Sequence, residues 1–270
     1  MMEINKKGLR LFFVIDETPF YHPDFLQTIL KNLDGKDKVV GTARVTAAPA
    51  ANDIERYIRR NWRKLYFSEI LVLVLRKYGA LVKALLARNN PYSAKFYSVV
   101  GLLKAHKIPY FDVQKNINRP EILEQIRATE PDIIISSNSL IFGKELLAIP
   151  TIACINRHSA LLPSYGGVWP VFQAFRVGEK ITGASVHLME PTIDTGVVLS
   201  QEVVPITENS SLSDLYEACF NVSSIAVLKT LDKLRHRDLT SVTTNQQASY
   251  FTFPTEVHWQ EFRARGGRFV

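Results

Sequence analysis

The chain has 270 residues and carries 33 Lys and Arg against 26 Asp and Glu, which gives a net charge of +7. This length is enough to bury a sizeable core without a disulfide framework or a metal staple, and Cys154 and Cys219 lack zinc-type spacing, so we expect reduced, buried thiols. The basic pI, near 9.3, favours an anionic partner but does not choose among phosphates, nucleic acid and membrane.

The N-terminal residues predict the start of an α/β sheet. Apolar Leu9–Ile15 is typical of a core strand, 23–33 of a helix and 38–45 of a second strand. The turn at 16–22 has no glycine, so a dinucleotide-binding loop and a Rossmann dehydrogenase are disfavoured. The apolar run at 11–15 is too short for a signal peptide, and we expect a cytoplasmic protein.

Residues 54–106 have a helical and basic pattern. The basic side chains Arg56, Arg59, Arg60, Arg63 and Lys64 precede the apolar run at 70–75, and Arg76, Lys77, Lys83 and Arg88 follow it. This run is far shorter than the roughly 20 residues that a membrane-spanning helix needs. We interpret the segment as helices that pack on the sheet with a solvated basic face; contact with an anionic membrane surface is the less favoured alternative.

The middle of the chain predicts two buried strands that lead to a candidate site. A short strand is expected at 108–113, a helix at 120–129, and buried parallel-type strands at 132–136 and 151–155. Asn156 and His158 follow the last of these, and their spacing places them on one side while Arg157 points away. In open α/β sheets, ligands bind beyond the carboxyl ends of the strands.

The C-terminal part predicts a helix at 168–178, strands at 182–189 and 197–204, and a long helix from Ser211. The two strands are separated by the turn Asp194-Thr195-Gly196, which is short enough for an antiparallel pair. The aromatic tail, with Tyr250 and Phe251, is expected to pack on the sheet or to form a dimer seam.

The letters N-R-H-S-A-L-L-P-S-Y-G-G, followed by I-D-T-G, carry a family resemblance. They resemble the folate-dependent formyltransferases, whose signature is Asn-x-His, Leu-Leu-Pro, Gly and a later Asp-x-Gly. The resemblance covers residues 132–205 well, includes the first strand weakly and leaves 53–118 unexplained. It implies formyl transfer from N10-formyltetrahydrofolate to an amine, and an open, mostly parallel, twisted α/β sheet with helices on both faces.

Together with the element pattern, the resemblance predicts a domain division. We expect a catalytic domain at 1–236, with a helical insertion at about 54–106, and a C-terminal extension at 237–270 that packs on the core or at a dimer seam. The tail has no room for the C-terminal domain that tRNA-directed members carry, so no nucleic-acid partner is expected.

The resemblance assigns catalytic roles to Asn156, His158 and Asp194. The Asn156 amide would donate to the oxyanion, and His158 would donate to the same oxygen or relay a proton. Asp194 would accept from the imidazole and fix its tautomer, or hold a water through which protons move. The remaining histidines are interpreted as structural: His22, His106, His187, His236 and His258.

The resemblance implies two loops that bind the folate, the first through its backbone groups, and no metal is expected. They contribute Asn138, Leu140, Ile141 and Phe142 after one strand, and Pro191, Thr192 and Ile193 before Asp194. In related formyltransferases the first loop wraps the pterin.

Three functions remain open from the sequence. The favoured one is N-formylation of a small primary amine, most plausibly an amino sugar on a nucleotide carrier, because the glycine-rich phosphate loop of glycinamide-ribonucleotide enzymes is missing at 16–22. The alternatives are a formyltetrahydrofolate hydrolase and a folate-binding or membrane-associated protein that has lost turnover.

Overall fold

A computed structural model describes residues 8–49, 54–86 and 95–270. Its centre is a seven-stranded sheet in the order β3-β2-β1-β4-β5-β7-β8, in which the β5–β7 and β7–β8 pairs are antiparallel and the other pairs are parallel. The strands are β1 (Arg10–Asp16), β2 (Lys38–Ala47), β3 (Tyr110–Gln114), β4 (Ile133–Ser137), β5 (Ala153–His158), β7 (Ile181–Leu188) and β8 (Val198–Pro205). The predicted fold class is confirmed.

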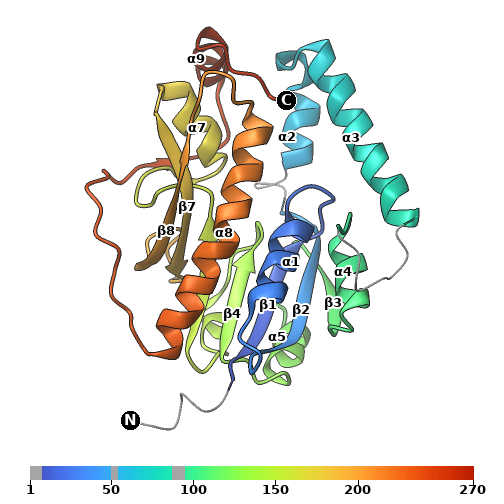
Figure 1. Cartoon of the computed structure of the whole chain (residues 1–270), viewed down its shortest axis with the longest axis vertical. Helices are drawn as coiled ribbons and strands as arrows, with labels where there is room; N and C mark the ends of the chain where they lie inside the picture. The colour runs from blue at the N-terminus through green and yellow to red at the C-terminus, as the bar shows by residue number, and fades with distance from the viewer. Residues whose placement is uncertain (1–7, 50–53, 87–94) are drawn as a thin grey trace.

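Helices cover both faces of this sheet because its central strands are apolar on both sides. Leu11, Phe13 and Ile15 of β1 pack under α1 (His22–Asn32), α4 (Val99–Ala105) and α8 (Leu212–Arg235). Phe12 and Val14 point to the other face, which α5 (Pro120–Arg127) and α6 (Lys144–Leu147) cover. Figure 1 shows α1 and α8 on the near side of the sheet and α5 on its far side. This alternation with burial on both faces is typical of parallel sheets.

Strand β5 begins later and ends later than the sequence predicted. We expected a strand at 151–155 that ends at Asn156; β5 runs instead from Ala153 to His158. The reason is its antiparallel partner β7, because Asn156 pairs with His187 and His158 with Ser185. Both polar residues are therefore paired with β7, Asn156 within β5 and His158 as its last residue.

The C-terminal residues return to the core beside the Gly-Gly pair. Strand β9 (Tyr250–Phe251) pairs with β6 (Gly166–Gly167), and α9 (Glu256–Ala264) packs against α7 (Pro170–Val177). Phe172 and Phe262 stack at 4.7 Å in the apolar cluster between these helices. The tail is thus an integral layer of the fold, while the predicted domain boundaries stay a prediction.

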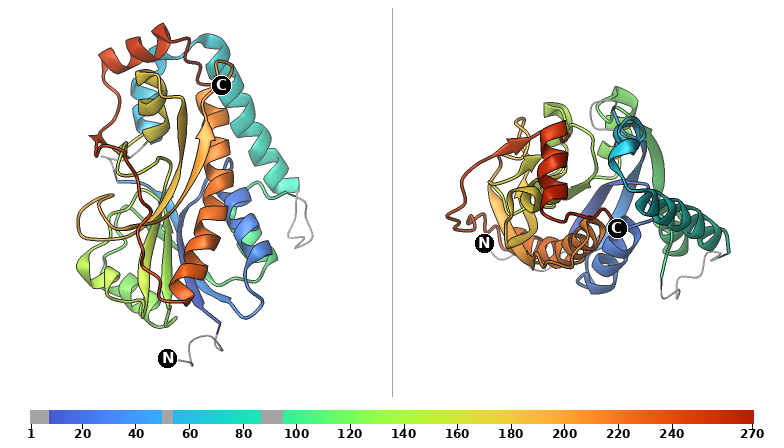
Figure 2. Two further views of the ribbon diagram at one scale, coloured as in Figure 1. Left: turned by 60° about the vertical axis from the view of Figure 1, so that its left-hand side comes forward. Right: turned by 90° about the horizontal axis from the view of Figure 1, so that it is seen from above.

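The inserted helices do not all pack on the sheet. Helix α2 (Ile54–Arg60) and the 3-10 helix η2 (Trp62–Lys64) lead into α3 (Phe67–Leu86), which stands at the outside of the molecule (Figures 1 and 2). The expectation that the whole segment covers the sheet is wrong for α3, most of whose large apolar side chains are exposed, whereas α4 does pack on the sheet. Within the described residues, no helix is long and apolar enough to cross a membrane.

Candidate active site

Strand β5 orients the first two predicted catalytic residues as the two-residue alternation requires. Asn156 and His158 face the β7–β8 turn, whereas the guanidinium of Arg157 lies on the opposite side, 3.7 Å from the centroid of Phe220 on α8. Arg157 Nε also donates to Ser137 Oγ at 3.1 Å. The prediction that Arg157 points away from the site is confirmed.

Asp194 reaches the same place from the turn between β7 and β8. Its backbone is left-handed, with φ of 56°, a conformation that Asp tolerates better than most residues. Oδ2 of the carboxylate accepts the N–H of Gly167 at 2.8 Å, and the side chain is 8% exposed. The Gly-Gly pair therefore anchors the carboxylate as well as the C-terminal strand.

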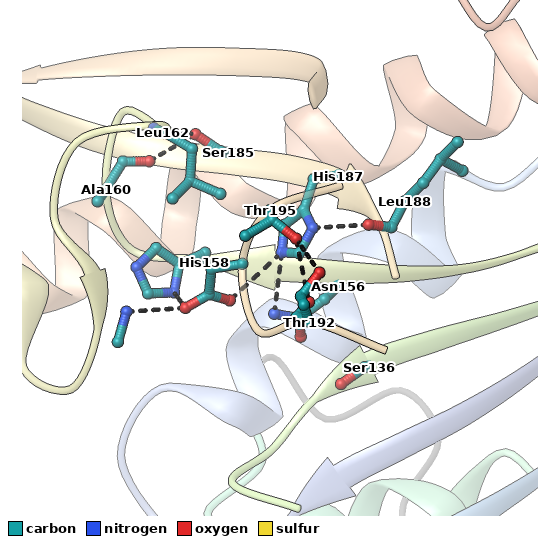
Figure 3. Close-up of polar contacts among 12 residues, drawn as sticks. Ser136, Asn156, His158, Ala160, Leu162, Ser185, His187, Leu188, Thr192 and Thr195 are labelled. Carbon is teal, nitrogen blue, oxygen red and sulfur yellow. Dashed lines mark hydrogen bonds and ion pairs between the residues drawn. The ribbon is translucent and has the colours of Figure 1, made fainter. Parts of the chain in front are cut away.

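A fourth side chain, His187 of β7, lies beside Asn156 (Figure 3), and its Nε2 is also near the Asp194 carboxylate. Its Nδ1 must carry the proton, because it lies 2.8 Å from the carbonyl oxygen of Leu188, which only accepts. Nε2 is therefore the acceptor, and Asn156 Nδ2 donates to it at 3.3 Å. His187 thus fixes which way the Asn156 amide is turned. We expected His187 to be purely structural, and it instead holds a predicted catalytic group.

The tautomer of His158 is fixed by a carbonyl group, not by Asp194. His158 Nε2 lies 2.9 Å from the carbonyl oxygen of Tyr165, so Nε2 carries the proton. Nδ1 then presents a lone pair to Asp194 Oδ2 at 3.8 Å, which is beyond hydrogen-bonding distance. This corrects the expectation that Asp194 accepts from the neutral imidazole. His187 Nε2 lies 3.6 Å from Asp194 Oδ1.

Burial sets the charge of this group. It lowers the pKa of His158 below the usual 6.5, although Asp194 and the Tyr165 carbonyl oppose the shift. Burial alone would raise the pKa of Asp194, but His158, His187 and the Gly167 N–H together hold it below its usual value. The lowered pKa values of His158 and Asp194 leave an ionised carboxylate facing the lone pair of a neutral His158 Nδ1. Such an arrangement attracts a proton into its centre.

Exposure separates the roles within the group. Asn156 is only partly buried, whereas His158 is 8% exposed and His187 is 2% exposed. Asn156 is thus more open to a bound molecule than the two imidazoles. The imidazoles and the carboxylate are more deeply buried.

The Leu-Leu-Pro part of the sequence signature supports this geometry. Ser185 Oγ of β7 donates to the Ala160 carbonyl at 2.6 Å and accepts the Leu162 N–H at 2.9 Å (Figure 3). Gln201 of β8 adds bonds to the Leu162 carbonyl and to Ser185 Oγ. The loop after His158 is thereby fixed to the antiparallel strands that carry His187 and lead to Asp194.

The first predicted folate loop follows β4 and is held by its own side chains. Asn138 donates to Val14 O and Ser136 Oγ at 3.1 and 3.0 Å and accepts the Leu140 N–H at 2.7 Å. Leu140 and Phe142 are buried in the core, whereas Ile141 is 56% exposed. Contacts from this loop would therefore come from its backbone and Ile141.

The second predicted folate loop is the exposed segment before Asp194. Pro191, Thr192 and Ile193 are all exposed, and the Thr192 and Thr195 hydroxyls hydrogen-bond to each other (Figure 3). Cys154 and Cys219 are free and buried, and the described residues contain no cluster of His, Cys, Asp and Glu suited to a metal ion.

His187 has no sequence feature that separates it from the four other histidines that we interpreted as structural. What distinguishes His187 is that its strand, β7, pairs antiparallel with β5, the strand that carries Asn156. Placing the two opposite each other requires the β5–β7 register, in which Asn156 pairs with His187.

A family model described as formyl transferase matches residues 22–231 of the chain. Among curated relatives, a methionyl-tRNA formyltransferase from Clostridium perfringens (strain 13 / Type A) is 31% identical over 147 residues, which cover 54% of this chain and 48% of that protein. One from Lysinibacillus sphaericus is 30% identical over 203 residues, which cover 73% and 64%. The chain spans about half the length of the first of these relatives.

Solved structures share the fold. A phosphoribosylglycinamide formyltransferase from Anaplasma phagocytophilum has a TM-score of 0.58 at 18% identity, covering 92% of this chain and 100% of that one. An N-formyltransferase from Helicobacter canadensis, in complex with folinic acid and dTDP-3-aminofucose, has a TM-score of 0.57 at 16% identity, covering 91% and 71%.

Proposed function

This chain belongs to the formyl transferase family, and we propose that it moves the formyl group of N10-formyltetrahydrofolate to a primary amine. The observation that supports this most is the partly exposed amide of Asn156, oriented by His187, whose Nε2 also lies 3.6 Å from the buried carboxylate of Asp194. The reaction needs a donor for an oxyanion and a group that holds a proton. It needs no nucleophilic Ser or Cys, because the substrate amine attacks.

The proposed reaction follows from the groups present. The amine nitrogen attacks the formyl carbon, and the carbonyl oxygen becomes an oxyanion to which the Asn156 amide donates. The bond from carbon to N10 then breaks, the carbonyl reforms, and the leaving N10 takes up a proton. The products are an N-formyl amine and tetrahydrofolate.

The proton lost by the amine can be held by the His158 and Asp194 pair. His158 Nδ1 faces the carboxylate with a free lone pair, so a proton there makes an imidazolium that Asp194 stabilises at 3.8 Å. The pair can then return this proton towards N10, directly or through a water.

We place the folate between the loops at 138–142 and 191–193. Both lie next to the reacting groups, since the first follows β4 beside β5 and the second ends at Asp194. Asn138, Leu140 and Phe142 would act through the backbone that they hold, while Ile141, Pro191, Thr192 and Ile193 are exposed for contact.

For the acceptor we propose an amino sugar on a nucleotide carrier. In place of the glycine-rich phosphate loop of ribonucleotide-directed members, the end of β1 carries Asp16 and Glu17. Glu17 already accepts the N–H groups of Val99 and Val100 at the start of α4, at 2.9 and 3.0 Å. The N–H groups at the start of α4 are thus already bound by Glu17 and are not available to a phosphate, and one fold relative is described with a nucleotide-linked amino sugar.

We also propose a cytoplasmic location, which the two free, buried cysteines support.

The test incubates the protein with N10-formyltetrahydrofolate and a panel of amines, including dTDP- and UDP-linked amino sugars, glycinamide ribonucleotide and charged initiator tRNA. We expect tetrahydrofolate to form only with an amino sugar, with one N-formyl product per turnover. Asn156→Ala serves as the inactive control. Formate release without any amine would favour a hydrolase, and folate binding without turnover of any acceptor would contradict the proposal.

A further inference from the structure

Helix α3 is held against the body of the protein by the buried Glu69 and by Ile70 and Leu73, which pack on the apolar cluster around Trp169. Glu69 is 4% exposed, its Oε2 lies 2.6 Å from Arg263 Nη2, and its carboxylate also accepts the Phe269 N–H. Two turns later, Arg76 donates to Ser213 Oγ at 2.9 Å. These contacts attach the helix to the C-terminal residues and to the start of α8.

The opposite side of α3 is apolar and faces outwards. Nine of its residues have between 44 and 81% of their surface exposed: Phe67, Leu71, Val74, Leu75, Tyr78, Leu81, Val82, Leu85 and Leu86. At about 100° per residue they occupy one continuous arc along the helix, which we call the outer face of α3. Surface helices of globular proteins normally show the reverse orientation, so this face calls for a covering partner.

The surroundings of the outer face are strongly basic. Residues 56–86 contain eight Lys or Arg and a single acidic residue, Glu69, which is buried against Arg263. Arg59, Arg60 and Arg63 are exposed just before α3, and Lys83 is exposed near its end. Trp62 and Tyr66, at 55 and 56% exposure, lie at the same end as the arginines.

This charge distribution distinguishes between two occupants. Two copies that met through the outer face would bring like charges close together, which opposes association. An anionic bilayer surface complements the basic residues and accepts the apolar side chains, and aromatic residues such as Trp62 and Tyr66 favour the interface between headgroups and acyl chains.

We propose that the outer face of α3 docks on an anionic membrane surface. The helix lies along the surface and does not cross it, because Glu69 and Arg76 attach its inner side to the protein and it is not apolar enough to span a membrane. Leu75, Leu85 and their neighbours enter the headgroup boundary, while Arg59, Arg60 and Arg63 contact acidic headgroups.

The test is flotation of the full chain with vesicles of phosphatidylcholine alone and of phosphatidylcholine with phosphatidylglycerol. We expect flotation with the anionic vesicles, weakened by added salt, and little with the neutral ones. Leu75→Glu/Leu85→Glu should lower the bound fraction about tenfold, because both side chains would carry charge into the boundary. Arg59→Glu/Arg60→Glu/Arg63→Glu should abolish the preference for anionic lipid.

The matched control is Val203→Glu, which adds a charge at a position of 56% exposure on β8, away from α3. It should float like the wild-type chain, and all variants should keep its thermal midpoint. Failure of the wild-type chain to float, or equal flotation of the Leu75→Glu/Leu85→Glu variant, would overturn the proposal. So would a wild-type dimer in solution that this variant dissociates. The readout is lipid binding, so it does not depend on the proposed activity.

Discussion

Each histidine at the candidate site is oriented by a backbone carbonyl, and this decides what the polar groups can do. Leu188 O holds His187 and Tyr165 O holds His158, so both rings turn a lone pair towards Asp194. The Asn156 amide is in turn oriented by His187. The roles are therefore divided between a partly exposed hydrogen-bond donor and a buried pair that holds a proton.

Replacing Asn156 by Ala should remove the oxyanion donor and leave the folate loops intact. We expect turnover to fall by about 10²- to 10³-fold, the usual effect of losing one such donor. The folate dissociation constant, measured by isothermal titration, should stay close to the wild-type value. Wild-type turnover would show that the amide does not contact the reacting oxygen.

His158 and Asp194 should behave as a coupled pair. Asp194→Asn removes the charge that stabilises the imidazolium, so single-turnover rates should fall steeply while folding persists. Because groups that act as a unit are non-additive, His158→Ala/Asp194→Asn should be only slightly slower than His158→Ala. Losses that multiply would mean that Asp194 acts separately, for instance by holding a water.

At the scale of elements, the Gly166–Gly167 strand joins the site to the C-terminal tail. Gly167 donates its N–H to Asp194, and its backbone has a φ of 90°. A Cβ at this position would lie 2.1 Å from the carbonyl oxygen of Phe251 in β9. Only glycine allows the tail to approach this closely, so a tail segment far away in sequence contacts the glycine that binds the Asp194 carboxylate.

Gly167→Ala should therefore damage both stability and activity. Its matched control is Gly266→Ala, which has a φ of 74° but no atom within 4 Å of the added Cβ. The control should lose only about 1–2 kcal/mol in the free energy of unfolding, from the backbone conformation. Gly167→Ala should lose more in urea titrations, together with most of its turnover. Equal effects of the two changes would show that the β6–β9 contact is unimportant.

At the scale of the whole molecule, the buried histidines couple stability to pH. His22 packs edge-on against Phe220 at 4.8 Å, and its Nε2 donates to Ser137 O at 3.0 Å. Burial, assisted by Arg157, lowers the pKa of His22 to about 3. Because the folded pKa of His22 is lowered, the folded protein keeps its full stability above the unfolded pKa of about 6.5. This stability is lost as the pH falls from about 6.5 towards 3, because the unfolded chain binds the proton first.

Between pH 7 and pH 5, His22 alone should reduce the free energy of unfolding by about 2 kcal/mol, because only the unfolded chain takes up the proton. Urea titrations at both pH values should show this drop in the wild-type chain and a smaller one in His22→Gln. His236→Gln, at an exposed site on the surface, provides the control. The same pH dependence in His22→Gln and the wild-type chain would contradict this origin.

The sequence by itself determined the order of the elements, the α/β class and the shared side of Asn156 and His158. These are local properties: apolar runs predict strands, and a two-residue spacing in a strand places side chains on one side. The polar signature around them also sufficed to predict the family, which the match over residues 22–231 confirms.

Only the tertiary structure decided which groups complete the site and which surfaces stay open. The β5–β7 register places His187 opposite Asn156, and the β6–β9 pairing places Phe251 opposite Gly167. The apolar face of α3 points outwards because Glu69 pairs with Arg263 near the C-terminus and Arg76 bonds to Ser213 of α8. Register and helix rotation are set by pairing between distant segments, and local residue patterns do not encode that pairing.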